Sequence, residues 1–236
     1  MIIKKKMNHQ KKIVYLFGTG VTQAEIKLKG GTSGVLMRDV KDEILRKIEK
    51  DKIKNLVDIR NELTSEYADV EHLITLYEST GIPKHERIAK HLKRLFKEVV
   101  QERTNKLKPT LLLALIDMHE IQKLNEELVG ILTLNYEDML EQAIQDVKGG
   151  INYSIDISYT KNSYLQKREI FPLLKLHGSF NWANEFPITL TNDKKTKDTD
   201  HALWIPPGVE KRKERYPFSI IWGRAKEILN CDVLRV

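Results

Sequence analysis

An asparagine and a histidine, each placed directly after an apolar run, are the residues of this sequence best suited to chemistry. Asn135 follows the apolar residues 129–134, and His177 follows residues 170–176, which are also mainly apolar. A buried parallel strand presents a reactive side chain in this way at its carboxyl end. An amide and an imidazole are a poor set for peptide or phosphate hydrolysis. They suit the breaking of a bond whose leaving group already carries positive charge, because such a group departs without a proton from an acid.

Each of these residues also has an ordinary structural interpretation. Asn135 precedes a predicted helix, 137–147, and asparagine is a common helix N-cap, an alternative that Thr133 shares. His177 could equally be a hydrogen-bonded core histidine. As functional groups, Asn135 could hold a water or a ribose hydroxyl, and His177 could accept a proton near pH 7. Spacing alone leaves both interpretations open.

A glycine turn after the first apolar run, 13–17, is the third candidate. Its residues are Gly18, Thr19, Gly20, Val21 and Thr22. Glycines let backbone N–H groups approach a ligand closely, so the turn could cradle a pyrophosphate. The usual dinucleotide fingerprint has a third glycine where Gln23 stands. Alone, the turn is therefore a generic strand exit as much as a phosphate site.

The remaining pattern predicts the elements that position these residues. Apolar residues spaced three and four apart predict amphipathic helices within a block from about 39 to 128, with breaks near 81–83 and 108–109. Their apolar faces are Val40, Ile44 and Ile48; Ile88, Leu92, Leu95 and Val99; and Ala114, Met118, Ile121, Leu124 and Leu128. Further predictions are an alternating segment at 153–159, a polar loop at 191–200 and a last helix at 219–229.

The order strand, glycine turn, helices, strand, helix, strand predicts an α/β, Rossmann-like fold with a mainly parallel sheet and a large helical insertion. We expect a single domain over 1–236, in which 13–38 and 129–236 form the Rossmann-like part and 39–128 the insertion. Gly18, Asn135 and His177 would then share the carboxyl edge of the sheet, where such folds bind ligands.

Composition narrows the class of protein. The 236 residues are 41% hydrophobic and 31% charged, and no apolar run approaches the roughly 20 residues of a membrane span. No secretory signal is recognisable, so we expect a cytoplasmic protein. Cys231 is the only cysteine, which excludes an intrachain disulfide and a cysteine-rich zinc site. The net charge of +7 is scattered and accompanied by no recognition motif, so nucleic-acid binding is not favoured.

Together, the three segments resemble a family: the sirtuin-like (silent information regulator-like) domains of bacterial anti-phage defence proteins, relatives of the NAD-dependent sirtuins. Residues 18–22 are similar to its Gly-Ala-Gly turn with a hydroxyl residue two places on. Residues 133–136 (Thr-Leu-Asn-Tyr) resemble its Thr-Thr-Asn-Tyr-Asp, and 176–179 resemble its Leu-His-Gly-Ser. Residues 206–211 and the helix at 219–229 resemble less specific parts of the pattern.

The resemblance implies hydrolysis of NAD, as substrate, to nicotinamide and ADP-ribose, without zinc or any other metal. Asn135 would position the water or ribose, and His177 would act as the base. Residues 18–22 would hold the phosphates and the neighbouring ribose. The other residues predicted to bind the dinucleotide are Thr133, Glu137, Asp138 and Ser179. A sensor or effector partner, or a further fused domain, is also implied.

The sequence departs from the family pattern in places, and this keeps alternatives open. Glu137 stands where the family has aspartate, with Asp138 beside it, and Thr19 replaces a small alanine. Relatives continue beyond the strand matching 233–236, so we expect a fragment whose binding scaffold is incomplete. One alternative is a catalytically silent module that binds NAD or ADP-ribose. Another, a protein deacylase, is disfavoured by the single cysteine, since those enzymes carry a four-cysteine zinc module.

Overall fold

A computed structural model describes residues 10–32, 34–51, 60–64, 69–121, 126–159, 166–183, 188–190, 202–204 and 215–236. The predicted loop at 191–200 and the segment 206–211 lie outside these residues. The helices are α1 (Thr19–Leu28), α2 (Met37–Asp51), α4 (Arg60–Thr64), α5 (Val70–Ser79), α6 (Pro83–Thr104), α7 (Thr110–Ile121), α8 (Met139–Lys148) and α9 (Phe218–Ile228). The strands are β1 (Lys11–Phe17), β2 (Glu126–Thr133), β3 (Ile157–Tyr159), β4 (Leu173–Lys175), β5 (Gly178–Ala183), β6 (Ile188–Leu190), β7 (Ala202–Trp204) and β8 (Val233–Arg235).

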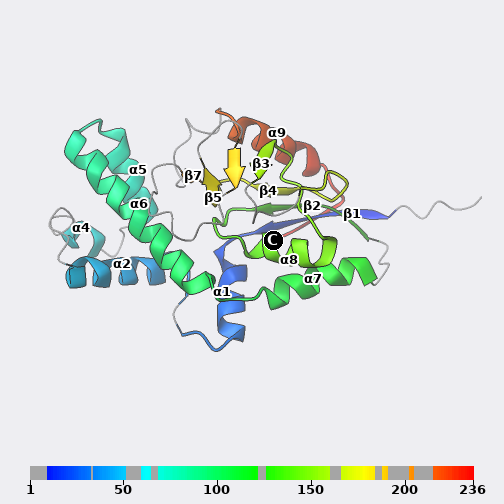
Figure 1. The fold of residues 1–236 in the computed structure, drawn as a ribbon, viewed down its shortest axis with the longest axis horizontal. Coiled ribbons are helices and arrows are strands. Elements are labelled where there is room, and N and C mark those ends of the chain that lie inside the picture. The colour runs from blue at the N-terminus through cyan, green and yellow to red at the C-terminus, as the bar shows by residue number, and fades with distance from the viewer. Residues whose placement is uncertain are drawn as a thin grey trace, which may run out of the picture.

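Four parallel strands form the central sheet, in the order β4-β2-β1-β8. Numbered along the chain, this order is 3-2-1-4, the first part of the doubly wound dinucleotide-binding arrangement. Successive strands are added on one side of β1 up to β4 and on the other side at β8. The strand order therefore reverses between β1 and β8, the place where such sheets bind ligands. The predicted α/β fold with a mainly parallel sheet is confirmed (Figure 1).

Helices cover both faces of this sheet, which explains why β1, β2 and β4 contain buried apolar runs. In Figure 1, α9 lies on one side of the sheet, and α7 and α8 lie on the other. Ile13, Val14, Ile131 and Leu174 are at most 2% exposed and belong to one core that also includes Ile221 of α9. Strands buried on both faces read as continuous apolar runs, and this is why the runs were recognisable in the sequence.

A second sheet, in the order β3-β6-β5-β7, was not predicted from the sequence. It mixes parallel and antiparallel pairs, and its strands β3, β6 and β7 are only three residues long. Of the alternating segment 153–159, only Ile157–Tyr159 is a strand. Strand β5 begins at Gly178, directly after His177, so this small sheet adjoins the predicted site.

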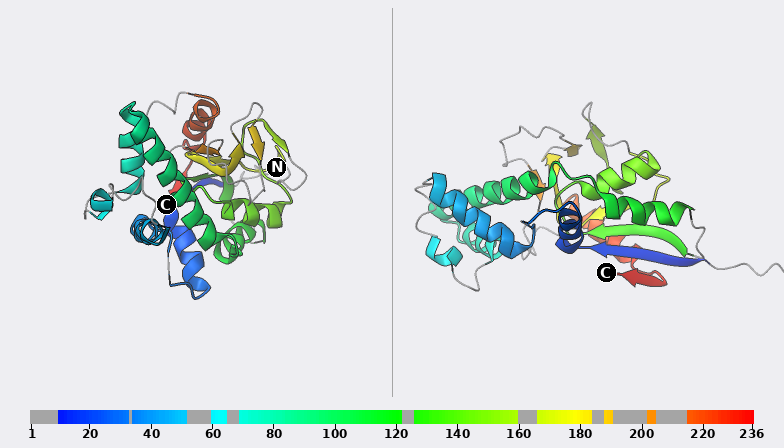
Figure 2. Two further views of the ribbon diagram at one scale, coloured as in Figure 1. Left: turned by 60° about the vertical axis from the view of Figure 1, so that its left-hand side comes forward. Right: turned by 90° about the horizontal axis from the view of Figure 1, so that it is seen from below.

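The helices between β1 and β2 agree with most of the predicted faces. Residues of α2 and α6 at the predicted positions, such as Ile44 and Leu92, are fully buried in a second hydrophobic core. Figure 2 shows these helices extending from one end of the central sheet. The division into a Rossmann-like part and an inserted block at 39–128 stays a prediction.

The face predicted for α7 was wrong. Leu112 and Ile116 are its buried residues at 1% exposure, whereas Ala114 is exposed. The helix ends at Ile121, and Leu128, assigned to the same face, lies in β2; Leu124 falls outside the described residues. The helix is apolar on several sides, so spacing alone could not choose the buried face.

Helix α1 was not predicted from the sequence. It begins at Thr19, so residues 19–22 of the predicted turn are the first turn of the helix and only Gly18 precedes it. Glu25, fully buried on α1, caps α7: its Oε2 accepts from the Thr110 amide at 3.0 Å and its Oε1 from the Leu112 amide at 2.9 Å. A carboxylate at a helix N-terminus satisfies free amides and complements the helix dipole.

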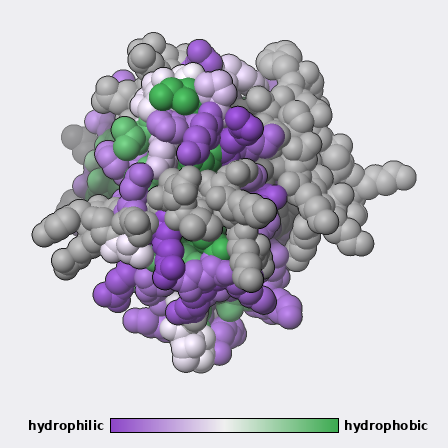
Figure 3. All heavy atoms as spheres, turned by 90° about the vertical axis from the view of Figure 1, so that its left-hand side faces the viewer, coloured by the Kyte–Doolittle hydropathy of each residue, from purple (hydrophilic) through white to green (hydrophobic). Residues whose placement is uncertain are grey.

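The end of the molecule formed by the helices between β1 and β2 has a mostly hydrophilic surface. In Figure 3 the described residues of this face are largely polar, with small, separate hydrophobic spots. Among the described residues, no helix combines the length and apolar character needed to cross a membrane.

Candidate active site at the carboxyl edge of the sheet

Three strand ends bring the predicted residues to one edge of the central sheet. Gly18 directly follows β1, Asn135 stands two residues after β2, and His177 two residues after β4. Thr133 of β2 pairs with Lys175 of β4, so Asn135 and His177 occupy equivalent positions beyond paired residues. The carboxyl edge therefore unites the three segments, as the strand order predicts.

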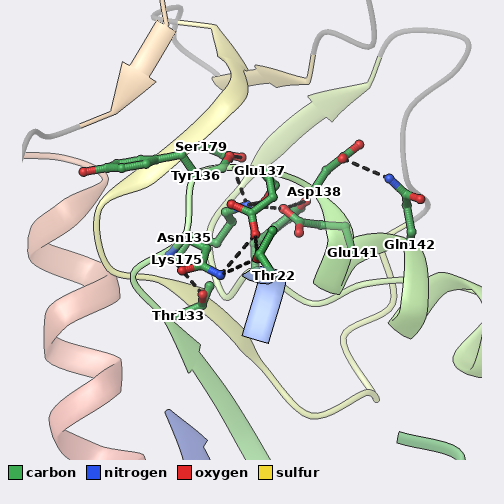
Figure 4. Close-up of polar contacts among 11 residues, drawn as sticks. Thr22, Thr133, Asn135, Tyr136, Glu137, Asp138, Glu141, Gln142, Lys175 and Ser179 are labelled. Atoms are coloured by element: carbon green, nitrogen blue, oxygen red, sulfur yellow. Dashed lines mark hydrogen bonds and ion pairs between the residues drawn. The ribbon is translucent and has the colours of Figure 1, made fainter. Parts of the chain in front are cut away.

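Asn135 forms the centre of a buried hydrogen-bond network (Figure 4). Its Nδ2 donates to the Gly18 carbonyl at 3.1 Å, to Thr22 Oγ1 at 3.0 Å and to Glu137 Oε1 at 3.1 Å. Thr22 Oγ1 in turn donates to Glu137 Oε1. The Asn135 amide N–H donates to Thr133 Oγ1 at 3.0 Å. The network thus ties the glycine turn to the end of β2.

The network fixes the orientation of the Asn135 amide and leaves its oxygen unpaired. A carbonyl and a carboxylate accept hydrogen bonds but do not donate them, so only Nδ2 can face Gly18 and Glu137. Asn135 is 3% exposed, and its Oδ1 has no hydrogen-bond partner among the described residues. A buried acceptor without a donor is costly, and a bound hydroxyl or water would satisfy it.

The structure distinguishes the two acidic residues that follow Tyr136. Glu137 contacts both Asn135 and Thr22, so it belongs to the network. Asp138 instead accepts a hydrogen bond from Gln142 Nε2 at 3.0 Å, and its side chain points away from Asn135 (Figure 4). Of the two acidic candidates, Glu137 is therefore the one placed to influence Asn135.

The segment after β4 positions His177 through backbone geometry. Gly178 has a φ of +78°, a left-handed conformation that side chains disfavour, and it turns the chain from β4 into β5. Ser179, fully buried, donates from Oγ to the Tyr136 carbonyl at 3.0 Å. The half-buried His177 ring lies 6.0 Å from the Tyr136 ring, centre to centre. The two segments therefore support each other directly.

An ion pair beneath the site was missed by the sequence reasoning. Lys175 and Glu141, both 0% exposed, are joined by a 2.7 Å contact between Nζ and Oε1. Lys175 Nζ also donates to the Glu137 carbonyl at 2.5 Å, which holds the backbone just after Asn135. Burial raises the pKa of Glu141, and the charge of Lys175 opposes that rise. A lysine inside the apolar run 170–176 was the available signal, because a buried cation requires a counter-charge.

The start of α1 offers a place for an anion beside this network. Gly18 is the N-cap and has no side chain to cap the first amides of the helix, while Thr19 and Gly20 are exposed. A Cβ added at Gly18 or Gly20 would have nothing within 4 Å. Neither residue has a positive φ, so the protein itself does not require glycine there. The open space over an uncapped helix N-terminus fits a phosphate.

Within the described part of the chain, no group of three or more histidine, cysteine, aspartate and glutamate side chains could hold a metal ion. The lone Cys231 donates to the Val233 carbonyl at 3.3 Å. The site as described consists of amide, hydroxyl, carboxylate and imidazole groups at the strand ends.

Two comparisons with known proteins bear on this arrangement. A search of curated proteins found none that matches the chain. Residues 129–221, less than half of the chain, match the family model of the SIR2-like domain. The matched segment contains Asn135 and His177 but not the glycine turn. The part of the chain from within β2 to the first turn of α9 is therefore similar to a SIR2-like domain.

Proposed function

We propose that this protein binds NAD and hydrolyses its nicotinamide–ribose bond. The observation that carries the proposal is the unpaired, buried Oδ1 of Asn135 beside the glycine turn, at the edge where doubly wound sheets bind ligands. The similarity of residues 129–221 to a SIR2-like domain supports the same substrate.

The residues present fit the parts of NAD. Asn135 Oδ1 would accept a hydrogen bond from a ribose hydroxyl or from the attacking water. The start of α1, with open space over Gly18 and Gly20, would hold the pyrophosphate. Thr133, Thr22 and Glu137 would act chiefly through Asn135. Thr22 and Glu137 accept from its side-chain amide, and Thr133 accepts from its backbone N–H.

The reaction requires little acid catalysis from the protein. The bond between ribose carbon and nicotinamide nitrogen breaks, and its electron pair returns to the cationic ring, which leaves as neutral nicotinamide. Water oxygen forms the new bond to that carbon and releases one proton. His177 would take this proton or orient the ribose through a hydroxyl, and Asn135 would position the water. Orientation and electrostatic stabilisation are thus the main contributions of the site.

We further propose that this activity depletes cytoplasmic NAD during anti-phage defence, as the sequence resemblance implies. A sensor or effector protein, or a further domain, would then control the site. Expression of the chain with and without its genomic neighbours, followed by phage plating, would test this role. Equal plaque numbers with wild-type and His177→Ala protein would contradict it.

The hydrolase proposal is tested by incubating purified protein with NAD and measuring nicotinamide and ADP-ribose by chromatography. We expect release by the wild type and none by His177→Ala. Calorimetry with ADP-ribose separates binding from turnover. Binding without nicotinamide release would indicate the silent module instead, and removal of acetyl groups from a lysine peptide would indicate a deacylase. The absence of both ADP-ribose binding and NAD turnover would contradict the proposal.

Alanine at Gly20 is expected to weaken NAD binding about tenfold or more without loss of stability. The new methyl group would project into the open space where the phosphate is proposed to bind. Within the first turn of α1, alanine has a better helix propensity than glycine by up to about 1 kcal/mol. Calorimetric titration with ADP-ribose and thermal melting measure the two effects.

Ala24→Gly, an exposed position on the same helix, is the matched control. It should lower the melting temperature slightly and leave the affinity unchanged. If Gly20→Ala binds as tightly as the wild type, the start of α1 does not contact the phosphates.

A further inference from the structure

Tyr136, next to Asn135, directs its ring away from the hydrogen-bond network and into an aromatic cluster. Its ring stacks on Phe180 at 5.1 Å between centres, with 22° between the planes, and lies 6.0 Å from the His177 ring. Phe96 of α6 and Trp204 of β7 meet it edge-on, at 5.8 and 5.1 Å. Tyr136 is 6% exposed, so its ring connects His177 with the helices between β1 and β2.

The hydroxyl of Tyr136 donates to Oε1 of Glu71, on α5, at 3.2 Å. Glu71 is 9% exposed and 65 residues away along the chain. The pKa of Glu71 is raised to about 8, chiefly by burial and also by the charge of Asp69 at the N-cap of α5, while the hydrogen bond from Tyr136 opposes the rise. Burial and the nearby Glu71 also raise the pKa of Tyr136 well above 10. Near pH 7 the pair is therefore mainly neutral.

Other charged groups lie on the elements that pack against this pair. On α6, Lys93 pairs with Glu78 of α5, and burial lowers the pKa of Lys97. Glu62 of α4 accepts a hydrogen bond from Tyr77 of α5 at 2.7 Å. Glu71 itself hydrogen-bonds to Tyr136.

We propose that Glu71 is a positioning residue of the site: by holding the Tyr136 hydroxyl, it fixes the ring against which His177 packs. The His177 ring lies against the Tyr136 ring, and a displacement of about 1 Å in a catalytic group can reduce turnover 100-fold. Through this hydrogen bond, helix α5 would influence the equilibrium between a fixed and a displaced His177 imidazole. The kinetic part of the test rests on the proposed NAD hydrolysis, whereas the spectroscopic part does not.

Glu71→Gln and Glu71→Leu test the inference. Glutamine reproduces the neutral acid and can still accept from Tyr136, whereas leucine cannot accept. In protein carrying ¹³C-labelled histidine, the ring signal of His177, assigned with His177→Ala, is expected to move in Glu71→Leu and not in Glu71→Gln at pH 7. With NAD, Glu71→Leu should lower kcat about tenfold and change KM less than about twofold.

The pH dependence gives a second measurement. Because the pKa of folded Glu71 lies above its ordinary value, its stabilising protonated form prevails at low pH and is lost as pH rises through about 8. The ionised carboxylate still accepts from the Tyr136 hydroxyl but adds a buried charge beside it, so the wild-type His177 signal should change between pH 7 and 9 without reaching that of Glu71→Leu. In Glu71→Gln this change should be missing.

Glu86→Gln removes an exposed carboxylate from α6 and is the matched control, with no expected effect. If Glu71→Leu does not fold, Tyr136→Phe, which keeps the ring and removes the donor, replaces it. An unchanged His177 signal in Glu71→Leu or Tyr136→Phe would overturn the positioning role. A moved signal in protein that does not hydrolyse NAD would support the positioning role and contradict only the proposed hydrolysis.

Discussion

Alanine in place of Asn135 is expected to reduce NAD hydrolysis at least about 100-fold, the usual effect of removing one preorganised polar group from a reacting centre. The change removes the unpaired Oδ1, which is proposed to hold the water or ribose, and the Nδ2 that joins Gly18, Thr22 and Glu137. The loss should lie in kcat more than in KM. Initial rates of nicotinamide release over a range of NAD concentrations measure both constants.

Leu134→Ala is the control for this change, since Leu134 is the preceding residue and is 37% exposed. It should retain nearly full activity. Asn135→Asp keeps the shape but places a second carboxylate against Glu137, so we expect it to be inactive and less stable. Activity of Asn135→Ala within threefold of the wild type would show that Asn135 is only a structural residue.

Methionine in place of Lys175 is expected to destabilise the protein by about 3–5 kcal/mol, because it leaves Glu141 charged and fully buried. The Glu137 carbonyl would also lose its donor at 2.5 Å. Below neutral pH the loss should become smaller, since burial raises the pKa of Glu141 and protonation then removes the unpaired charge. Urea unfolding at pH 5 and pH 8 measures both effects.

The double change Lys175→Met with Glu141→Leu separates the charge from the shape. Replacing both partners should recover much of the stability lost in the single variant, since no buried charge remains. Arg168→Met breaks an exposed ion pair with Asp156, whose side chains are 86% and 84% exposed, and should cost less than about 1 kcal/mol. If Lys175→Met and Arg168→Met have the same free energy of unfolding, the buried Lys175–Glu141 pair contributes no more to stability than the exposed one, and the prediction is wrong.

The fold class was predictable because the strands of a doubly covered parallel sheet are apolar on both faces. Residues 13–17, 129–134 and 170–176 were recognisable for this reason, and they correspond to β1, β2 and β4. The candidate residues that follow these strands, Gly18, Asn135 and His177, could then be placed at one edge of the sheet without any knowledge of distances. The roles of these residues toward NAD remain predictions.

The features that escaped prediction depend on contacts between distant residues. Lys175 and Glu141 stand 34 residues apart, and each alone is an ordinary charged residue. Glu71 joins Tyr136 across 65 residues, and the second sheet is assembled from strands as short as three residues. No local period signals such pairs. The choice between Glu137 and Asp138 likewise needed the direction of each side chain.

The start of α1 has a consequence for how quickly and how tightly a ligand can bind. Because residues 19–28 are already helical, and because Glu25 fastens α1 to α7, the amides above the site are held in place before a ligand arrives. A flexible loop of the same length would lose roughly 1–2 kcal/mol of conformational entropy per residue on becoming ordered. Here that loss has already occurred during folding, so association does not have to wait for a loop to close.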